Sequence, residues 1–176
     1  MKLAHLSQRF VRALWPAPPR ADDLAWAASI LTPAAMGEFR RLPNHDQRHA
    51  LGVARAVQTA LAGSADADDE RWLSAALLHD IGKLDARLGV YGRVVATVSG
   101  AVAGRRMADA WSQRCGLTRR IGLYLRHPEL GASRIRLAGG PEEAARWAEA
   151  HHAPESWETL GLPPPVVAAL DAADND

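Results

Sequence analysis

Apolar residues recur at three- and four-residue spacings along most of the chain, and no stretch shows the strict alternation of a half-buried strand. A period of about 3.6 residues places such positions on one face of a helix. We therefore expect an all-α fold. The expected helices cover residues 3–14, 22–31, 33–42, 44–61, 70–80, 93–115, 117–127, 141–152 and 166–174.

Three of these helix ends carry specific signals. Thr32 followed by Pro33 predicts an N-cap with proline at the first helical position. Asn44, with Gln47 three residues later, predicts a capping box at the start of its helix. Pro128 is expected to end the helix before it, because proline cannot donate a hydrogen bond within a helix.

The length of 176 residues indicates a single domain, because domains typically have about 100–200 residues. A proline-rich linker, Trp15–Pro19, separates the first expected helix from the rest. We expect residues 1–42 to form an N-terminal helical extension and residues 43–176 to form the main domain.

Charge and cysteine content narrow the possible functions. The 21 basic and 20 acidic residues leave a net charge of +1, which argues against strong nucleic-acid binding. The single Cys115 excludes an internal disulfide and a cysteine-rich metal site.

The first residues lack an export signal, and the longest uncharged apolar stretch, 94–104, is too short to span a membrane. We expect a cytoplasmic protein with no membrane partner.

Histidines and aspartates continue the apolar faces of several expected helices. His49, for example, lies on one stripe with Val53 and Val57. Burying such polar groups is costly unless each is hydrogen-bonded or bound to a metal ion, so shared ligation explains the pattern. The predicted metal ligands are His49, His79, Asp80, His127, His151, His152 and Asp171.

These imidazole and carboxylate ligands suit one or two divalent ions. The candidate metals are Fe, Mn, Zn, Ni, Co and Mg. Two ions can be held if Asp80 bridges them through its two oxygens.

The order of these residues resembles a known family. His49, then His79-Asp80, then Asp171 is similar to the H…HD…D signature of the HD superfamily of metal-dependent phosphohydrolases. The segment Leu78–Lys83 resembles that family's HDIGK variant. The resemblance implies an HD-type helical bundle with a metal site over residues 43–176.

Further residues resemble the HD-GYP branch, whose members hold two or three metal ions. His127 and the pair His151-His152 are similar to its additional ligands, and Asp171–Asp174 is similar to its closing DxxD. After the histidine pair, however, residues 153–157 read Ala-Pro-Glu-Ser-Trp in place of the Gly-Tyr-Pro segment. We therefore do not expect cyclic-di-GMP as a substrate.

The resemblance and the ligand pattern predict a phosphohydrolase that uses metal-activated water on a small phosphomonoester or nucleotide. Asp80 and Lys83 are the predicted catalytic residues, and Lys83 is expected to contact a phosphate oxygen. For Lys83, the alternative is a solvated lysine at a helix end.

Arg105 and Arg106 add to a basic region that could line the site. Two other functions stay open: a di-iron oxygenase of the HD type and a metal-bound signalling module without catalysis.

Overall fold

The structure, a computed structural model, describes residues 17–103 and 105–175. The predicted helix over 3–14 lies outside these residues, and so do the side chains of Arg105 and Arg106. The helices are α2 (Ala21–Ile30), α3 (Pro33–Arg40), α4 (Asn44–Ala60), α5 (Glu70–Leu78), α6 (Lys83–Ala86), α7 (Val90–Ala103), α8 (Arg105–Ser112), α9 (Gly116–Leu125), α10 (His127–Leu137), α11 (Glu142–Ala150), the 3-10 helix η1 (Pro154–Thr159) and α12 (Pro164–Asn175).

The described residues form helices and contain no strand, which confirms the predicted all-α class. Helix α5 lies at the centre and packs against α4 on one side and α11 on another. Each of its residues from Trp72 to Leu78 is buried. Because α5 is enclosed along most of its length, the residues that follow it, His79 and Asp80, are also deeply buried.

Helices α2 and α3 share the main hydrophobic core with the helices that follow them. Ala27, Ala35 and Phe39 are almost fully buried in the same cluster as residues of α4, α5, α10, α11 and α12. Thr32 caps α3 as predicted, since its side chain accepts a hydrogen bond from Ala35 N at 3.1 Å.

Two predicted helix ends are wrong. Pro43, and not Asn44, is the N-cap of α4, and Gln47 instead donates a hydrogen bond to Leu42 O at 2.7 Å. Pro128 does not end a helix but lies in the first turn of α10, which begins at His127. The first turn tolerates proline because its amide would have no partner within the helix.

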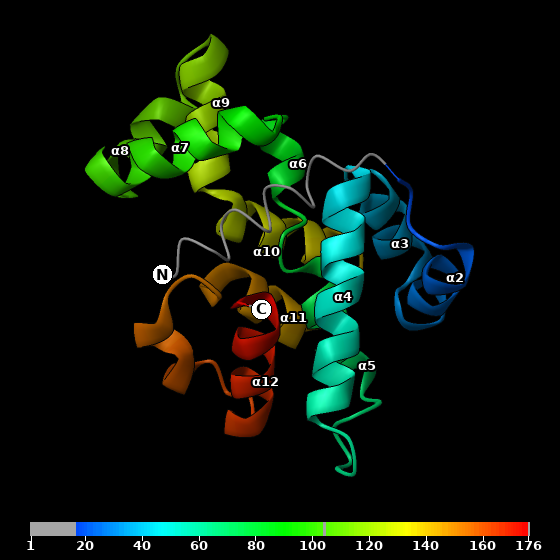
Figure 1. The fold of residues 1–176 in the computed structure, drawn as a ribbon. Helices are drawn as coiled ribbons and strands as arrows, with labels where there is room; N and C mark the ends of the chain where they lie inside the picture. Colours follow the sequence, from blue (N-terminus) through cyan, green and yellow to red (C-terminus); the bar gives the residue numbers. More distant parts are fainter. Residues whose placement is uncertain (1–16, 104, 176) are drawn as a thin grey trace.

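Helices α7, α8 and α9 gather at one end of the molecule and are connected to the rest through α6 (Figure 1). Ala86, Leu88 and Ala96 form a second, smaller core there, and Ile121, Leu123 and Tyr124 of α9 pack against it. The predicted single helix over 93–115 is divided between α7 and α8.

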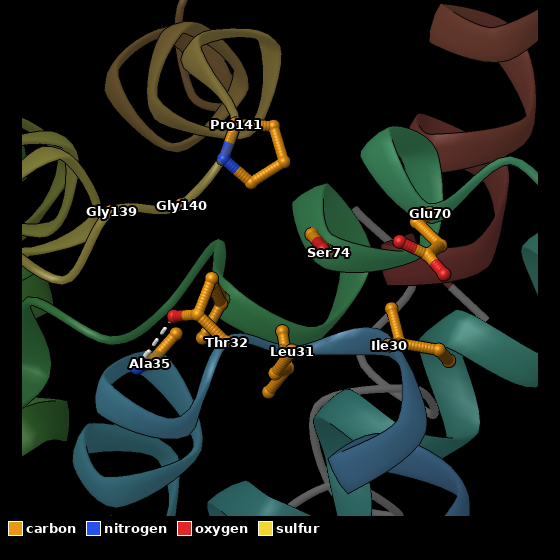
Figure 2. Close-up of a pocket in the computed structure, with 10 residues that line it drawn as sticks. Ile30, Leu31, Thr32, Ala35, Glu70, Ser74, Gly139, Gly140 and Pro141 are labelled. Atoms are coloured by element: carbon orange, nitrogen blue, oxygen red, sulfur yellow. Dashed lines mark hydrogen bonds between the residues drawn. The ribbon is translucent and has the colours of Figure 1, made fainter.

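A pocket of about 240 Å³ lies between the α2–α3 turn, α5 and the α10–α11 turn (Figure 2). Ser74 and Leu78 line it from α5, and Thr32 and Pro141 line it from the two turns. None of the predicted ligands lines this pocket. In the part of the chain that the structure describes, no helix has the length and hydropathy needed to cross a bilayer.

Candidate metal centre

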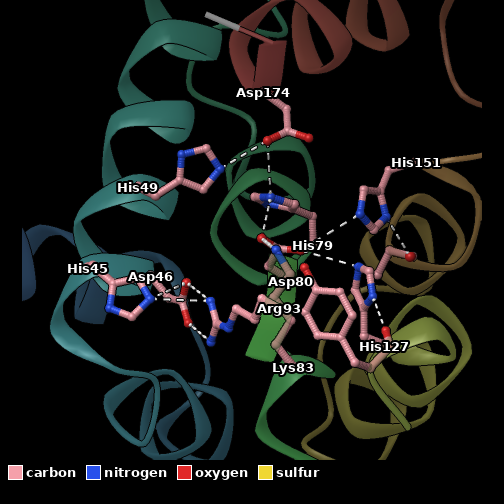
Figure 3. A network of polar contacts seen from close by, with 12 residues as sticks. His45, Asp46, His49, His79, Asp80, Lys83, Arg93, His127, His151 and Asp174 are labelled. Atoms are coloured by element: carbon pink, nitrogen blue, oxygen red, sulfur yellow. Dashed lines mark hydrogen bonds and ion pairs between the residues drawn. The ribbon is translucent and has the colours of Figure 1, made fainter. Parts of the chain in front are cut away.

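Most of the predicted ligands meet where the ends of several helices converge on α4 (Figure 3). His79 and Asp80 follow α5, His127 begins α10, His151 follows α11, and Asp174 lies in the last turn of α12. His49 comes from α4, where it continues the buried stripe of Val53 and Val57. The fold therefore brings together side chains that are far apart in the sequence.

The first cluster consists of His49, His79 and Asp174, whose potential ligand atoms all lie within 4.8 Å of one another. His49 Nε2 donates a hydrogen bond to Asp174 Oδ1 at 2.9 Å. His79 Nε2 lies 3.5 Å from the same oxygen. Two imidazoles and a carboxylate thus point at one position.

The second cluster consists of His127, His151 and His152, whose ring nitrogens also lie within 4.8 Å of one another. The ring of His127 lies 5.5 Å from that of His151 and 5.2 Å from that of His152, measured between centroids. His127 and His151 are buried, whereas His152 is exposed. This cluster therefore has an open side.

Asp80 lies between the two clusters. Its Oδ2 is 3.4 Å from His79 Nε2 of the first cluster. Its Oδ1 is 3.5 Å from His127 Nε2 and 3.8 Å from His151 Nε2 of the second cluster. Each carboxylate oxygen therefore faces a different cluster, as bridging by Asp80 requires (Figure 3).

Backbone carbonyls fix the orientation of three of these histidines. His79 Nδ1 donates to Ala76 O at 2.8 Å, His127 Nδ1 to Tyr124 O at 2.7 Å, and His151 Nδ1 to Ala148 O at 2.8 Å. Because a carbonyl can only accept, Nδ1 carries a proton in each ring, and Nε2 is the atom that binds a metal ion when the ring is neutral. The same outer hydrogen bond is typical of histidines that bind metal ions.

The buried polar atoms fit a bound cation. His79 Nε2, Asp80 Oδ1, His127 Nε2 and His151 Nε2 are buried without a hydrogen-bond partner. Leaving such groups unpaired costs about 1–3 kcal/mol each. Three of these atoms, Asp80 Oδ1 and the Nε2 atoms of His127 and His151, are acceptors, and their convergence favours a positively charged ligand at this point.

The electrostatics differ between the two clusters. Burial lowers the pKa of His79, but the carboxylates of Asp80 and Asp174 outweigh burial and raise the pKa to about 10. Burial, together with Lys83, holds the pKa of His127 well below its usual range. Burial, His79 and His152 lower the pKa of His151 to about 3. The first cluster thus attracts a cation, and the second presents neutral imidazoles, the form that binds metal.

The other predicted catalytic residue, Lys83, also lies inside the site. Its Nζ forms a very short contact with Asp80 Oδ2, and its side chain is only 14% exposed. Burial lowers its pKa, but Asp80, Tyr124 and Asp46 outweigh burial and raise the pKa. Lys83 is therefore a charged group within the site and not a solvated lysine at a helix end.

A second ion pair joins α4 to α7 beside Lys83. Arg93 donates from Nη1 to Asp46 Oδ1 at 2.7 Å and from Nη2 to Asp46 Oδ2 at 2.6 Å. His45 Nε2 lies 3.2 Å from Arg93 Nη1 and belongs to neither cluster. The spacing of the sequence can place Asp46 near the site, because Asp46 precedes His49 by one helical turn. It cannot indicate the partner, because Arg93 lies 47 residues beyond Asp46.

One predicted ligand, Asp171, lies outside both clusters. Asp171 accepts a hydrogen bond from Asn175 Nδ2 at 2.8 Å and belongs to neither cluster. Asp174 occupies the position that we expected for Asp171. At about 1.5 Å per residue, Asp174 lies about 4.5 Å further along α12. The helix therefore meets the site with its last turn.

This difference gives a direct test. Asp174→Asn is expected to weaken metal binding at the first cluster at least about tenfold, because an amide oxygen replaces a charged ligand. Asp171→Asn should leave metal affinity unchanged, since it alters only the contact with Asn175. Titration of each purified variant with a divalent metal measures both affinities. Equal effects of the two substitutions would contradict the assignment of Asp174.

The segment that replaces Gly-Tyr-Pro supports the second cluster. Trp157 in η1 donates from Nε1 to Ala150 O at 2.9 Å, and its ring lies 5.6 Å from that of Trp147. Trp147 is buried in the core, and Ala150 immediately precedes His151. This segment therefore fixes the end of α11.

Comparison with known protein families matches residues 47–176 to the HD domain. The chain belongs to the HD domain family. The match includes both clusters, Asp80 and Lys83, and it confirms the resemblance to the HD superfamily. Comparisons with curated proteins and with solved structures found no match. HD domains bind divalent metal ions, and the family generally consists of metal-dependent phosphohydrolases.

Proposed function

We propose that this HD domain is a metal-dependent phosphohydrolase that acts on a small phosphomonoester or nucleotide. Asp80 carries the proposal, because its two oxygens face two separate histidine clusters. Sites with two metal ions stabilise both the attacking and the leaving oxygens during phosphoryl transfer. A shared carboxylate between two clusters supports this kind of site.

The residues would divide between two ions. His49, His79, Asp174 and Asp80 Oδ2 would hold the first ion, and His127, His151, His152 and Asp80 Oδ1 would hold the second. A bound divalent ion can lower the pKa of water from about 15.7 to about 7, which supplies hydroxide at neutral pH. Phosphoryl transfer then needs mainly positioning and charge neutralisation, so no nucleophilic side chain is required.

The charges of the site favour an anionic substrate. Two divalent ions would contribute four positive charges, and Lys83 adds a fifth. Asp80 and Asp174 contribute two negative charges, and Arg93 and Asp46 cancel each other. The resulting excess of positive charge suits a phosphomonoester dianion.

A panel of substrates tests this function. The protein would be loaded separately with Mn, Fe, Zn, Ni, Co and Mg and assayed with p-nitrophenyl phosphate and mononucleotides. We expect metal-dependent release of phosphate that a chelator abolishes. Cyclic-di-GMP should be cleaved poorly, because residues 153–157 lack the Gly-Tyr-Pro segment.

The same panel separates the alternatives. Uptake of dioxygen by the iron-loaded protein without phosphate release would favour a di-iron oxygenase. Metal binding without turnover of any phosphate ester would favour a signalling module. Either result would contradict the proposed hydrolase.

A further inference from the structure

Tyr124 on α9 lies directly beside the second cluster. Its ring centroid is 5.5 Å from that of His127. Its carbonyl oxygen accepts the hydrogen bond from His127 Nδ1 at 2.7 Å. The residue therefore both orients a candidate metal ligand and places an aromatic ring close to it.

The side chain of Tyr124 lies within electrostatic reach of two cations at the same site. It is among the groups that raise the pKa of Lys83, after burial and Asp80, and that of Arg93, after burial and Asp46. Both cations are themselves paired with carboxylates. The side chain is only partly buried, and its hydroxyl makes no hydrogen bond with any of the described residues.

A tyrosine hydroxyl usually has a hydrogen-bond partner when it is buried, and a substrate bound beside Tyr124 would cover its exposed part. Near Tyr124 the protein offers cations and a histidine whose nitrogen points at the cluster. An oxygen-rich anion bound beside His127 would supply the missing acceptor. A tyrosine hydroxyl has one proton to donate, so it can form a hydrogen bond to such an anion.

We propose that the Tyr124 hydroxyl donates a hydrogen bond to a non-bridging oxygen of the substrate phosphoryl group, next to Lys83. This inference rests on the proposed phosphohydrolase function and adds a residue that binds substrate. It places the phosphoryl group at the second cluster, on the side formed by α9. The contact exists in the substrate complex and in the complex with product phosphate alike.

Tyr124→Phe tests the contact, because phenylalanine keeps the ring against His127 and removes only the hydroxyl. We expect KM to rise about tenfold with little change in kcat, the size expected when one hydrogen bond to a charged oxygen is lost. The inhibition constant for inorganic phosphate should rise by the same factor. Metal content and thermal stability should stay at their wild-type values.

The other tyrosine of the described residues provides a matched control. Tyr91 on α7 is 72% exposed, so Tyr91→Phe should leave KM and phosphate inhibition unchanged. Wild-type KM and phosphate inhibition in Tyr124→Phe would overturn the contact, and so would a weakening that appears only together with metal loss. A wild type that hydrolyses no phosphate ester would instead overturn the proposed function.

Discussion

Asp80→Asn is expected to empty both halves of the metal centre and to lower phosphatase activity at least about 100-fold. Loss of an outer partner of a metal ligand already costs about 10- to 100-fold, and Asp80 is a direct candidate ligand for two ions. Its two oxygens are 3.4 Å from His79 Nε2 and 3.5 Å from His127 Nε2. An amide keeps the shape but supplies only one neutral oxygen. Metal content per chain and kcat/KM measure the effect.

Asp22→Asn is the matched control for this substitution. Asp22 lies exposed in the first turn of α2, so the same chemical change there should alter neither metal content nor activity. Full metal content and activity in Asp80→Asn would show that Asp80 has a structural role only.

Gly82→Ala is expected to disrupt the same centre by a steric route. A methyl group at Gly82 would overlap the carbonyl oxygen of His127 and would lie 2.6 Å from Gly131 N. Both are backbone atoms of α10, so a side-chain rotation cannot relieve the clash. Overpacking of this kind costs about 3 kcal/mol. For a chain of this length, that cost lowers the Tm by roughly 6–12 °C.

The shift of α10 should also reach the metal site, because His127 is the first residue of that helix. We therefore expect Gly82→Ala to lose metal from the second cluster before the first. Gly52→Ala on α4 is the control, since a methyl group there meets nothing within 4 Å. It should keep or raise the stability by up to about 1 kcal/mol. Equal Tm values for the two variants would contradict the close approach of Gly82 to α10.

Local sequence patterns predicted the elements that depend on local physics. The stripe of His49, Val53 and Val57 indicated a helix whose buried face carries a ligand, and that face is buried in the structure. Thr32 and Pro33 indicated the start of α3. Their signals lie within one or two helical turns, where spacing alone determines which side chains meet.

Other features depend on how helices pack, and the sequence could not supply them. Asp171 and Asp174 lie one turn apart on the same side of α12, so periodicity cannot choose between them. The choice depends on how far α12 extends past α4. The pairing of Arg93 with Asp46 likewise requires α7 to lie across α4, which no local pattern encodes.

The prediction that Pro128 ends a helix was wrong for a related reason. Proline ends a helix from the inside but is favoured in the first turn. Which of the two applies depends on where the previous helix stops. Helix α9 already ends at Leu125, so Pro128 begins a new helix and His127 becomes its first residue.

The number of metal ions bound per chain tests the two-cluster centre most directly. Elemental analysis of the metal-loaded wild type, His49→Gln and His151→Gln would compare one ligand from each cluster. We predict about two ions per chain in the wild type and about one in each variant, because each substitution removes a ligand from one cluster and leaves the other intact. One ion per chain in the wild type, or an unchanged ratio in both variants, would contradict the account.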